Sequence, residues 1–261
     1  MSKKLARSPL VLPAINEEFF AQLIQHQPFE MFKLPMIRDW VTLQRLQGVS
    51  VEDMEVEGEI DSGAIKNVLE YNREMIRNID KHLHTLSRPK LLLNALMSIY
   101  YIFQNRSTLE VLCIGPRTES EIFMLLSEGF QPNNITGLDI MSYSDFIDTG
   151  DMHKMPYRRN RFDIIFLGWV ITYGDIQKVA DECIRVGRKG AYVAIGVESP
   201  KVVDTSEQYG VTLNDNPDII RSTDELVEIF GDKVHAVPFR HEVHRKLKDT
   251  VDMVMVIIEL K

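Results

Sequence analysis

From Leu109 onward, short apolar runs alternate with segments whose apolar residues recur every three or four positions. The first pattern predicts buried strands and the second predicts amphipathic helices, so the alternation is typical of a parallel sheet with crossover helices. The clearest strand is Phe162–Val170, because a near-continuous apolar run suits a central strand buried on both faces. The other expected strands are Leu109–Ile114, Ile135–Ile140, Phe146–Asp148, Ala191–Val197, Lys233–Val243 and Val251–Leu260.

Two of the helices in this half begin at a capping box, which is a Ser or Thr followed three residues later by Glu. The two pairs are Thr118 with Glu121 and Ser222 with Glu225. Gly129 and Gly231 stand where these helices should end. A third helix is predicted over Ile176–Val186 from its apolar spacing. Because Glu121 belongs to a capping pair, we interpret it as a cap rather than as a ligand-binding residue.

The first 108 residues follow a different pattern, without alternating strands. Helical spacing predicts helices over Glu17–Gln25, Arg38–Gln47, Ser62–Leu83 and Pro89–Gln104. The acidic stretch Val51–Glu59 is interpreted as a loop or an edge strand. The chain therefore divides into a helical N-terminal cap region, residues 1–108, and an α/β domain, residues 109–261. The last two strands of that domain are joined by the short polar link His244–Thr250, which predicts an antiparallel hairpin.

Length and charge narrow the class of protein. The 261 residues suffice for one large domain or for a core domain with a smaller one. The net charge of −8 disfavours nucleic acid as the main partner. No apolar run reaches the roughly 20 residues of a membrane span, and no long apolar stretch follows the basic start, so we expect a cytoplasmic protein. Cys113 and Cys183 lie in apolar stretches and are expected to be buried free thiols.

A candidate site lies at the carboxyl ends of the first two strands. The first strand runs into a turn containing Gly115, and a helix N-terminus follows, where free backbone N–H groups bind an anion. The second strand ends in Asp139, 24 residues after Gly115. An acid at that place in a βαβ unit can accept both hydroxyls of a ribose. Together the two features predict a site for a nucleoside that carries an anionic group.

Four segments in the same order resemble the class I S-adenosylmethionine-dependent methyltransferases. They are Val111–Gly115, Thr136–Asp139, Gly150–Tyr157 followed by Phe162–Ile165, and Arg185–Tyr192. The terminal antiparallel hairpin is a further trait of that family. The resemblance implies a Rossmann-like fold, S-adenosylmethionine as cofactor and transfer of its methyl group to a small-molecule acceptor. It implies no metal, since positioning of the acceptor supplies much of the rate.

The resemblance also implies a role for individual residues along the cofactor. Gly115 lets the backbone approach the methionine part, and Asp139 binds the ribose diol. Asp151 accepts from the adenine amino group, with Met152 flanking the ring. At the exit of the next strand, two residues would face the reacting end of the cofactor. They are Gly168 and Trp169.

No catalytic residue is identified, although His153 and Tyr173 are candidates near this end of the sheet. His153 is either a general base or an ordinary surface residue. Trp169 and Tyr173 are either pocket aromatics or ordinary packing. We expect part of residues 10–60 to cover the site near these two aromatics; packing on the far side of the sheet, or a dimer interface, stays open.

Several positions depart from the family pattern. Arg117 and Glu119 occupy places where the family commonly has glycine, and Cys113 replaces its usual acid. Between Asp139 and Asp151 the chain is too short for the usual crossover helix, so Met141–Phe146 is predicted to be a loop. Two alternatives therefore remain: a non-catalytic binding or scaffold protein with this fold, and a nucleotide-binding enzyme of another kind. A homo-oligomer is also open.

Overall fold

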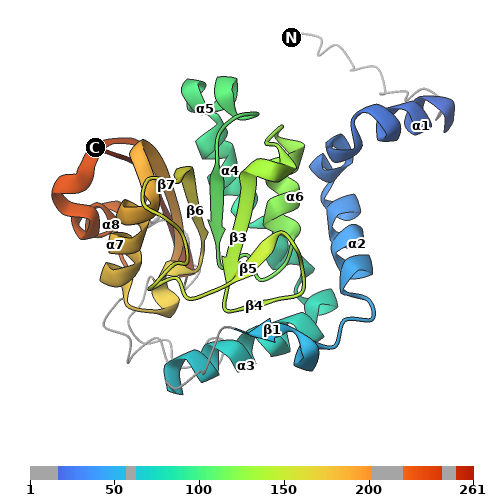
Figure 1. Cartoon of the computed structure of the whole chain (residues 1–261), viewed down its shortest axis with the longest axis horizontal. Helices are drawn as coiled ribbons and strands as arrows, with labels where there is room; N and C mark the ends of the chain where they lie inside the picture. Colours follow the sequence, from blue (N-terminus) through green and yellow to red (C-terminus); the bar gives the residue numbers. More distant parts are fainter. Residues whose placement is uncertain (1–16, 57–62, 201–219, 243–250) are drawn as a thin grey trace, which may run out of the picture.

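A computed structural model describes residues 17–56, 63–200, 220–242 and 251–261. Its centre is a seven-stranded sheet of order β5-β3-β2-β6-β7-β9-β8 (Figure 1). The strands are β2 (Val111–Ile114), β3 (Ile135–Asp139), β5 (Ile147–Thr149), β6 (Phe162–Gly168), β7 (Gly187–Pro200), β8 (Val234–His241) and β9 (Val251–Leu260). The first five are parallel, while β9 runs antiparallel to β7 and to β8. The Rossmann-like α/β fold and its C-terminal antiparallel hairpin are thus confirmed.

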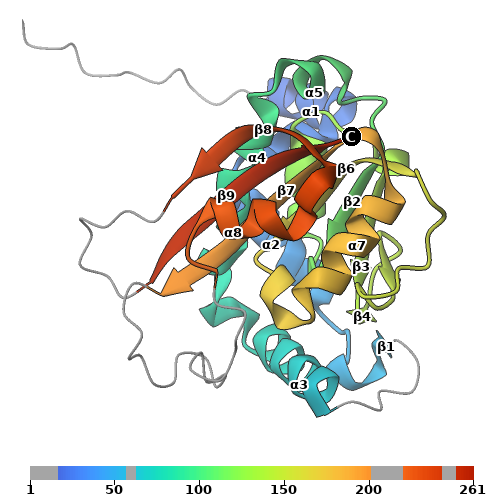
Figure 2. The same ribbon diagram turned by 90° about the vertical axis from the view of Figure 1, so that its left-hand side faces the viewer.

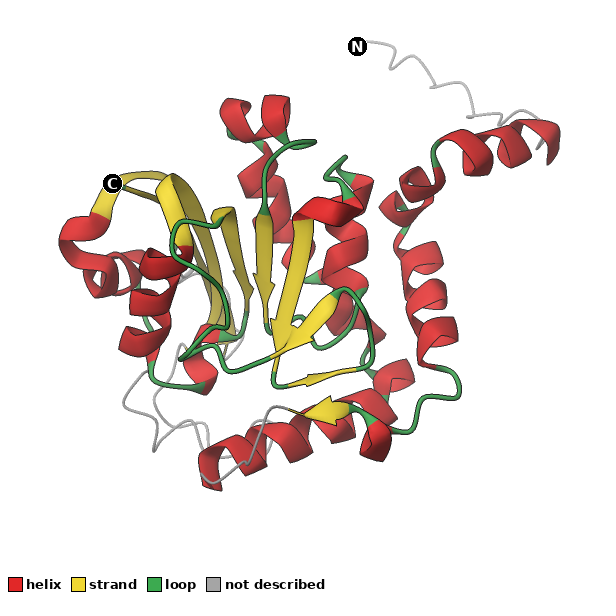
Figure 3. Cartoon of the chain, in the orientation of Figure 1, coloured by secondary structure: helices red, strands yellow, loops and turns green. Residues whose placement is uncertain are grey.

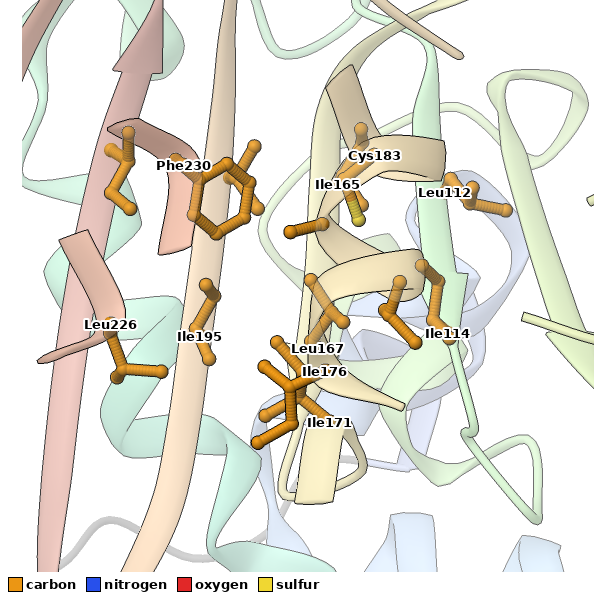
Figure 4. Packing of buried hydrophobic residues seen from close by; sticks show 14 of the residues in the cluster. Leu112, Ile114, Ile165, Leu167, Ile171, Ile176, Cys183, Ile195, Leu226 and Phe230 are labelled. Carbon is orange, nitrogen blue, oxygen red and sulfur yellow. The ribbon is translucent and has the colours of Figure 1, made fainter. Parts of the chain in front are cut away.

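Helices cover both faces of the sheet (Figure 3). On one face lie α7 (Ile176–Val186) and α8 (Thr223–Phe230), and their apolar sides share a buried cluster with β2, β6, β7 and β9. Figure 4 shows Ile176 and Cys183 of α7, with Leu226 and Phe230 of α8, packed over strand residues such as Ile195. The periodicity that predicted these two helices therefore also identifies the faces they bury.

The opposite face is covered by three helices. They are α4 (Pro89–Met97), α5 (Tyr100–Asn105) and α6 (Ser120–Ser127). Residues of all three join a second buried cluster with the other side of β2 and β6. Cys113 lies in this cluster and Cys183 in the first, and both are buried free thiols, as the sequence indicated. Because α4 packs in the same cluster as β2, the division of the chain at residue 108 stays a prediction.

The N-terminal helices lie along two other borders of the sheet. After α1 (Glu17–His26), helix α2 (Pro35–Leu46) lies beside α6. Helix α3 (Gly63–Arg77) crosses the carboxyl ends of the parallel strands in both Figure 1 and Figure 2. In fold terms this is the edge at which open α/β sheets bind ligands. The helical cap is therefore present, and the segment of it that reaches this edge is α3.

Several expectations for the individual elements need correction. The helix predicted over Ser62–Leu83 ends at Arg77, and the one predicted over Pro89–Gln104 is broken after Met97. The acidic stretch contributes a short strand, β1 (Glu55–Val56), which pairs with β4 (Met141–Ser142). Strand β4 lies within the segment Met141–Phe146 that was predicted to be a loop, and no helix connects β3 to β5. The link 244–250 lies outside the described residues.

The capping boxes gave one correct and one wrong prediction. Ser222 accepts a hydrogen bond of 3.2 Å from the backbone N–H of Glu225, as expected at the start of α8. Helix α6, in contrast, starts at Ser120 with Glu119 at its N-cap and no side-chain cap. The interpretation of Glu121 as a cap is therefore wrong, and its carboxylate is free for another role.

Candidate functional site

The turn after β2 keeps the backbone shape of a glycine-rich turn although its sequence departs from one. Gly115 has φ of 67°, and Arg117 has φ of 50°, a left-handed conformation that non-glycine residues rarely adopt. A Cβ on Gly115 would lie 2.3 Å from Cγ2 of Val170, so packing of that valine requires glycine here. Strand, turn and helix N-terminus are thus arranged as the sequence predicted, with Arg117 held in a strained conformation.

Asp139 lies beside this turn at the end of β3. Its Oδ2 accepts a hydrogen bond of 2.9 Å from the backbone N–H of Arg117. The side chain is buried, and burial raises the pKa of Asp139 while the bond from Arg117 opposes that rise. The acid is therefore located where a ribose diol could reach it, at the carboxyl end of the second strand.

Glu119, the second departure from the glycine pattern, ties the turn to the N-terminal region. Its carboxylate is fully buried and forms a bidentate ion pair with Arg45 of α2, one of whose bonds is 2.8 Å. Ser144, in the loop after β4, donates to the same carboxylate. A bidentate pair fixes both partners in orientation. Glu119 thus anchors α2 and the β4 loop to the start of α6.

The side chain of Arg117 points to α3. Its Nε donates to Oδ1 of Asn72 at 3.0 Å, and its guanidinium lies 5.2 Å from the ring centre of Tyr71. The Tyr71 ring in turn stacks on Tyr173, with centroids 6.0 Å apart. Partial burial raises the pKa of Tyr173, so its phenol stays neutral and can donate a hydrogen bond. Helix α3 is therefore held over the strand ends through Asn72 and Tyr71, which contact Arg117, and through the stacking of Tyr71 on Tyr173.

The prediction that part of residues 10–60 lies near Trp169 and Tyr173 falls partly on residues 10–16 and 57–60, which lie outside the described residues. Among the described residues, Tyr173 stacks on Tyr71 of α3, which begins at Gly63. Residues 17–56 instead flank α6 and the β4 loop, and in that region Val51 and Met54 pack with Met141. The apolar pattern showed that each of these helices buries one face, but it does not indicate which part of the fold that face packs against.

Asp151 and His153 form a second polar arrangement after β5. Oδ1 of Asp151 lies 2.6 Å from Nδ1 of His153, and Nε2 of His153 accepts a bond of 2.9 Å from the backbone N–H of Asp175. Both imidazole nitrogens are thereby engaged, which gives His153 the geometry of a bridge between two loops rather than that of a free base. Met152, between them, is half-buried against the first cluster.

Gly168 and Trp169 stand at the exit of β6. Trp169 has φ of 64°, and its ring packs on Gly196 of β7, where a Cβ would approach it to 3.1 Å. Its indole Nε1 is buried without a hydrogen-bond partner in the described part of the chain. A non-glycine residue in this conformation, carrying an unsatisfied buried donor, is typical of a functional position.

Glu121 was not recognised from the sequence, and it is the most unusual group of the site. A Cβ on Gly168 would lie 2.8 Å from its Oε1, so the carboxylate fills the space that this glycine leaves. Its Oε2 is buried and accepts no hydrogen bond from the described residues. Burial raises the pKa of Glu121 to about 8, with Asp139 adding to the rise and Arg117 opposing it. In the sequence, Glu121 fits a capping pair, so no functional role was predicted for it. The sequence also does not show that Gly168 lies against Glu121 in the fold.

Comparison with known proteins identifies the domain that carries this site. Residues 112–195 match the family model described as "Methyltransferase domain". Residues 112–195 therefore carry a methyltransferase domain. The match runs from β2 to β7 and includes the Gly115 turn, Asp139, Asp151 and Trp169. No curated protein matches the chain in sequence.

Solved structures to which the methyltransferase domain is similar come from several organisms. One is an S-adenosylmethionine-dependent methyltransferase from Thermotoga maritima, described as a possible histamine N-methyltransferase, at 15% identity and TM-score 0.47, covering 74% of this chain and 99% of that one. Another, from Aquifex aeolicus, has 16% identity and TM-score 0.39 and covers 62% and 88%. A third, from Mesorhizobium loti, has 12% identity and TM-score 0.43 and covers 58% and 90%.

The residues of the methyltransferase domain fit the cofactor of the family. An adenosine with an amino-acid tail offers hydroxyl and amino donors together with an ammonium group. The site offers the carboxylates of Asp139 and Asp151 after successive strands and that of Glu121 in α6, whose Oε2 is buried without a partner among the described residues. Within the described ranges, no cluster of three or more His, Cys, Asp or Glu is arranged to hold a metal ion, and no helix has the length and apolarity of a membrane span.

Proposed function

We propose that this protein transfers the methyl group of S-adenosylmethionine to a small-molecule acceptor. The observation that carries the proposal is the placement of Asp139 and Asp151 after neighbouring strands beside the Gly115 turn. Asp139 would accept from the ribose hydroxyls. Both contacts of Asp151 with His153 use its Oδ1 and fix the orientation of the carboxylate. Oδ2 of Asp151 would then accept a hydrogen bond from the adenine amino group.

The cofactor supplies an activated methyl group, and the protein supplies position and exclusion of water. In this proposal Met152 flanks the adenine ring, and Trp169 faces the reacting end, where an aromatic ring favours a cation. Tyr173, as a neutral phenol, donates a hydrogen bond to the acceptor. His153 holds Asp151 in position through its two ring contacts.

The acceptor is proposed to be small because α3 covers the strand ends. Tyr71 and Asn72 hold Arg117 and Tyr173 under that helix, which leaves little room for a folded macromolecule to approach the site. The net charge of −8 also repels nucleic acid. A cytoplasmic location is part of the same proposal, since small acceptors and the cofactor are found there.

The test is transfer of an isotope-labelled methyl group from S-adenosylmethionine in a cell extract separated into small metabolites, protein and RNA. We expect label in the small-metabolite fraction and none above background in the other two. Label in protein or RNA would overturn the acceptor class, while the methyltransferase activity would stand. The variant Asp139→Ala serves as the control, because it should lower labelling in whichever fraction the wild-type protein labels. Absence of label in all fractions, together with no cofactor binding, would favour a non-catalytic protein.

A further inference from the structure

Glu121 carries a carboxylate that its surroundings do not explain. It lies in the first turn of α6 but caps no backbone group among the described residues, and only 8% of the residue is exposed. Its Oε2 has no hydrogen-bond partner among the described residues. Leaving a carboxylate buried and unpaired is costly, and such groups in native proteins call for a functional reason.

The carboxylate lies at the point where the connections of the sheet reverse direction. From β2 the chain proceeds to β3 and β5 on one side, and then to β6 and β7 on the other. Glu121 faces Gly168 at the carboxyl end of β6, and it also raises the pKa of Cys113 in β2. Ligands of open α/β sheets bind at this reversal. The unpaired oxygen is thus located between β2 and β6 at the ligand-binding edge.

The charged and titratable groups around Glu121 do not neutralise it fully. Arg117 of the turn attracts it, but that guanidinium already contacts Asn72 and Tyr71 of α3. Asp139 of β3 repels it, and Cys113 of β2 is a buried thiol whose pKa is raised by burial. A further cation at this position would therefore stabilise the ionised carboxylate.

We propose that Glu121 binds the α-ammonium group at the amino-acid end of S-adenosylmethionine. The inference rests on the proposed function and concerns the orientation of the ligand. With adenine at Asp151 after β5 and ribose at Asp139 after β3, the remainder of the ligand must extend over β2 and β6. That direction leads to the carboxylate of Glu121, which lies beside Gly168.

Binding would then be coupled to loss of a proton. In the free protein the Glu121 carboxyl is mostly protonated at pH 7, because burial raises its pKa to about 8. When the ammonium arrives, the carboxyl ionises to form the ion pair, and its proton passes to the buffer. No electron moves, and the products are the paired carboxylate and ammonium together with one protonated buffer molecule.

The experiment is calorimetric titration of the wild-type protein at pH 7 in buffers of different ionisation enthalpy, which counts the protons released. The three ligands are S-adenosylmethionine, S-adenosylhomocysteine and 5′-methylthioadenosine. The first two carry the ammonium, the first alone carries a sulfonium, and the third carries neither. We expect release of about one proton with the first two and none with the third.

A pair of variants provides the second readout. Glu121→Gln should lower affinity for S-adenosylhomocysteine at least about tenfold and abolish proton release, while affinity for 5′-methylthioadenosine stays unchanged. Glu128→Gln is the matched control at the other end of the same helix, where Glu128 pairs with Lys90, and it should behave as wild type. An equal loss for both ligands would indicate a merely structural role and would overturn the proposal.

The titrations of the wild-type protein test the role of Glu121 even if the Glu121→Gln variant does not fold. Binding without proton release, or equal release with all three ligands, would overturn the role of Glu121 and leave the proposed function intact. Release with S-adenosylmethionine alone would contradict the ammonium assignment by pointing to the sulfonium. If none of the three ligands binds, the proposed function and this inference both fail.

Discussion

The backbone N–H of Arg117 donates a hydrogen bond of 2.9 Å to Oδ2 of Asp139, and this bond joins the turn after β2 to the end of β3. A residue that departs from the family pattern therefore supports the residue expected to bind ribose. Because Arg117 also contacts Asn72 and Tyr71, the same residue connects the cofactor side of the site to helix α3.

Replacing Asp139 should affect both binding and folding. Asp139→Ala removes the ribose acceptor, so cofactor affinity should fall at least about tenfold. It also leaves the N–H of Arg117 without its partner, which should cost roughly 1–3 kcal/mol of stability. Calorimetry and denaturant unfolding measure the two effects. Asp145→Ala, at an exposed acid of the same loop, is the control, and equal affinity of both variants would show that Asp139 is outside the site.

The ion pair between Arg45 and Glu119 should contribute to stability more than a surface pair does. Arg45→Met leaves a fully buried carboxylate without its cation, and we expect a loss of roughly 1–3 kcal/mol in the free energy of unfolding. Adding Glu119→Gln should recover part of it, as a double-mutant cycle would show. Arg77→Met, which breaks the exposed pair with Glu52, should have no measurable effect. Additive effects at Arg45 and Glu119 would contradict the pairing.

The stability of the unliganded protein should depend on pH through Glu121. Its pKa is about 8 in the folded protein and has the ordinary value of 4.5 when unfolded, so the folded state holds the proton more tightly. Stability from this group is therefore fully present below pH 4.5 and is lost as pH rises toward 8, by at most about 1.4 kcal/mol per pH unit. Buried Asp139 acts in the same direction.

Urea unfolding between pH 5 and 8 measures this slope. In Glu121→Gln, which has no titrating group at that position, the slope should be clearly smaller than in wild type. A wild-type slope of zero, or the same slope in both proteins, would mean that Glu121 is ionised in the folded state and that its pKa is not raised.

Arg117→Gly tests whether the contacts of Arg117 hold α3 against the turn after β2. Glycine relieves the left-handed strain, roughly 1 kcal/mol, but it removes the contacts with Asn72 and Tyr71. We expect little change in global stability and faster amide hydrogen exchange in α3. Asn72→Ala, which removes the hydrogen bond alone, should give a smaller increase. Unchanged exchange in Arg117→Gly would show that this arginine does not hold the helix, and stronger cofactor binding would show that it obstructs the site.

Much of the fold follows from local patterns in the sequence. Strands buried on both faces, such as β6, are marked by their apolar runs, and α7 has the predicted bounds of Ile176–Val186. Boundaries failed where tertiary contacts decide them. The Pro116–Arg117 turn delays the start of α6 to Ser120, and a capping pair that looks regular in sequence is therefore never formed.

The candidate site was only partly predictable. Asp139 and Asp151 follow strands and could be located by order along the chain. Tyr71 and Asn72 could not, because the amphipathic pattern of α3 indicates that one face is buried without indicating against which strand ends it lies. Glu121 could not be recognised either, since its significance depends on Gly168, which lies opposite it in space and 47 residues away in sequence.

The central claim is that this domain binds the cofactor of its family at the carboxyl ends of β3, β2 and β6. The most direct measurement is calorimetric titration of the wild-type protein with S-adenosylhomocysteine. The account predicts one site with affinity in the micromolar range, about −8 kcal/mol. Neither heat of binding nor a thermal shift at millimolar ligand would contradict it.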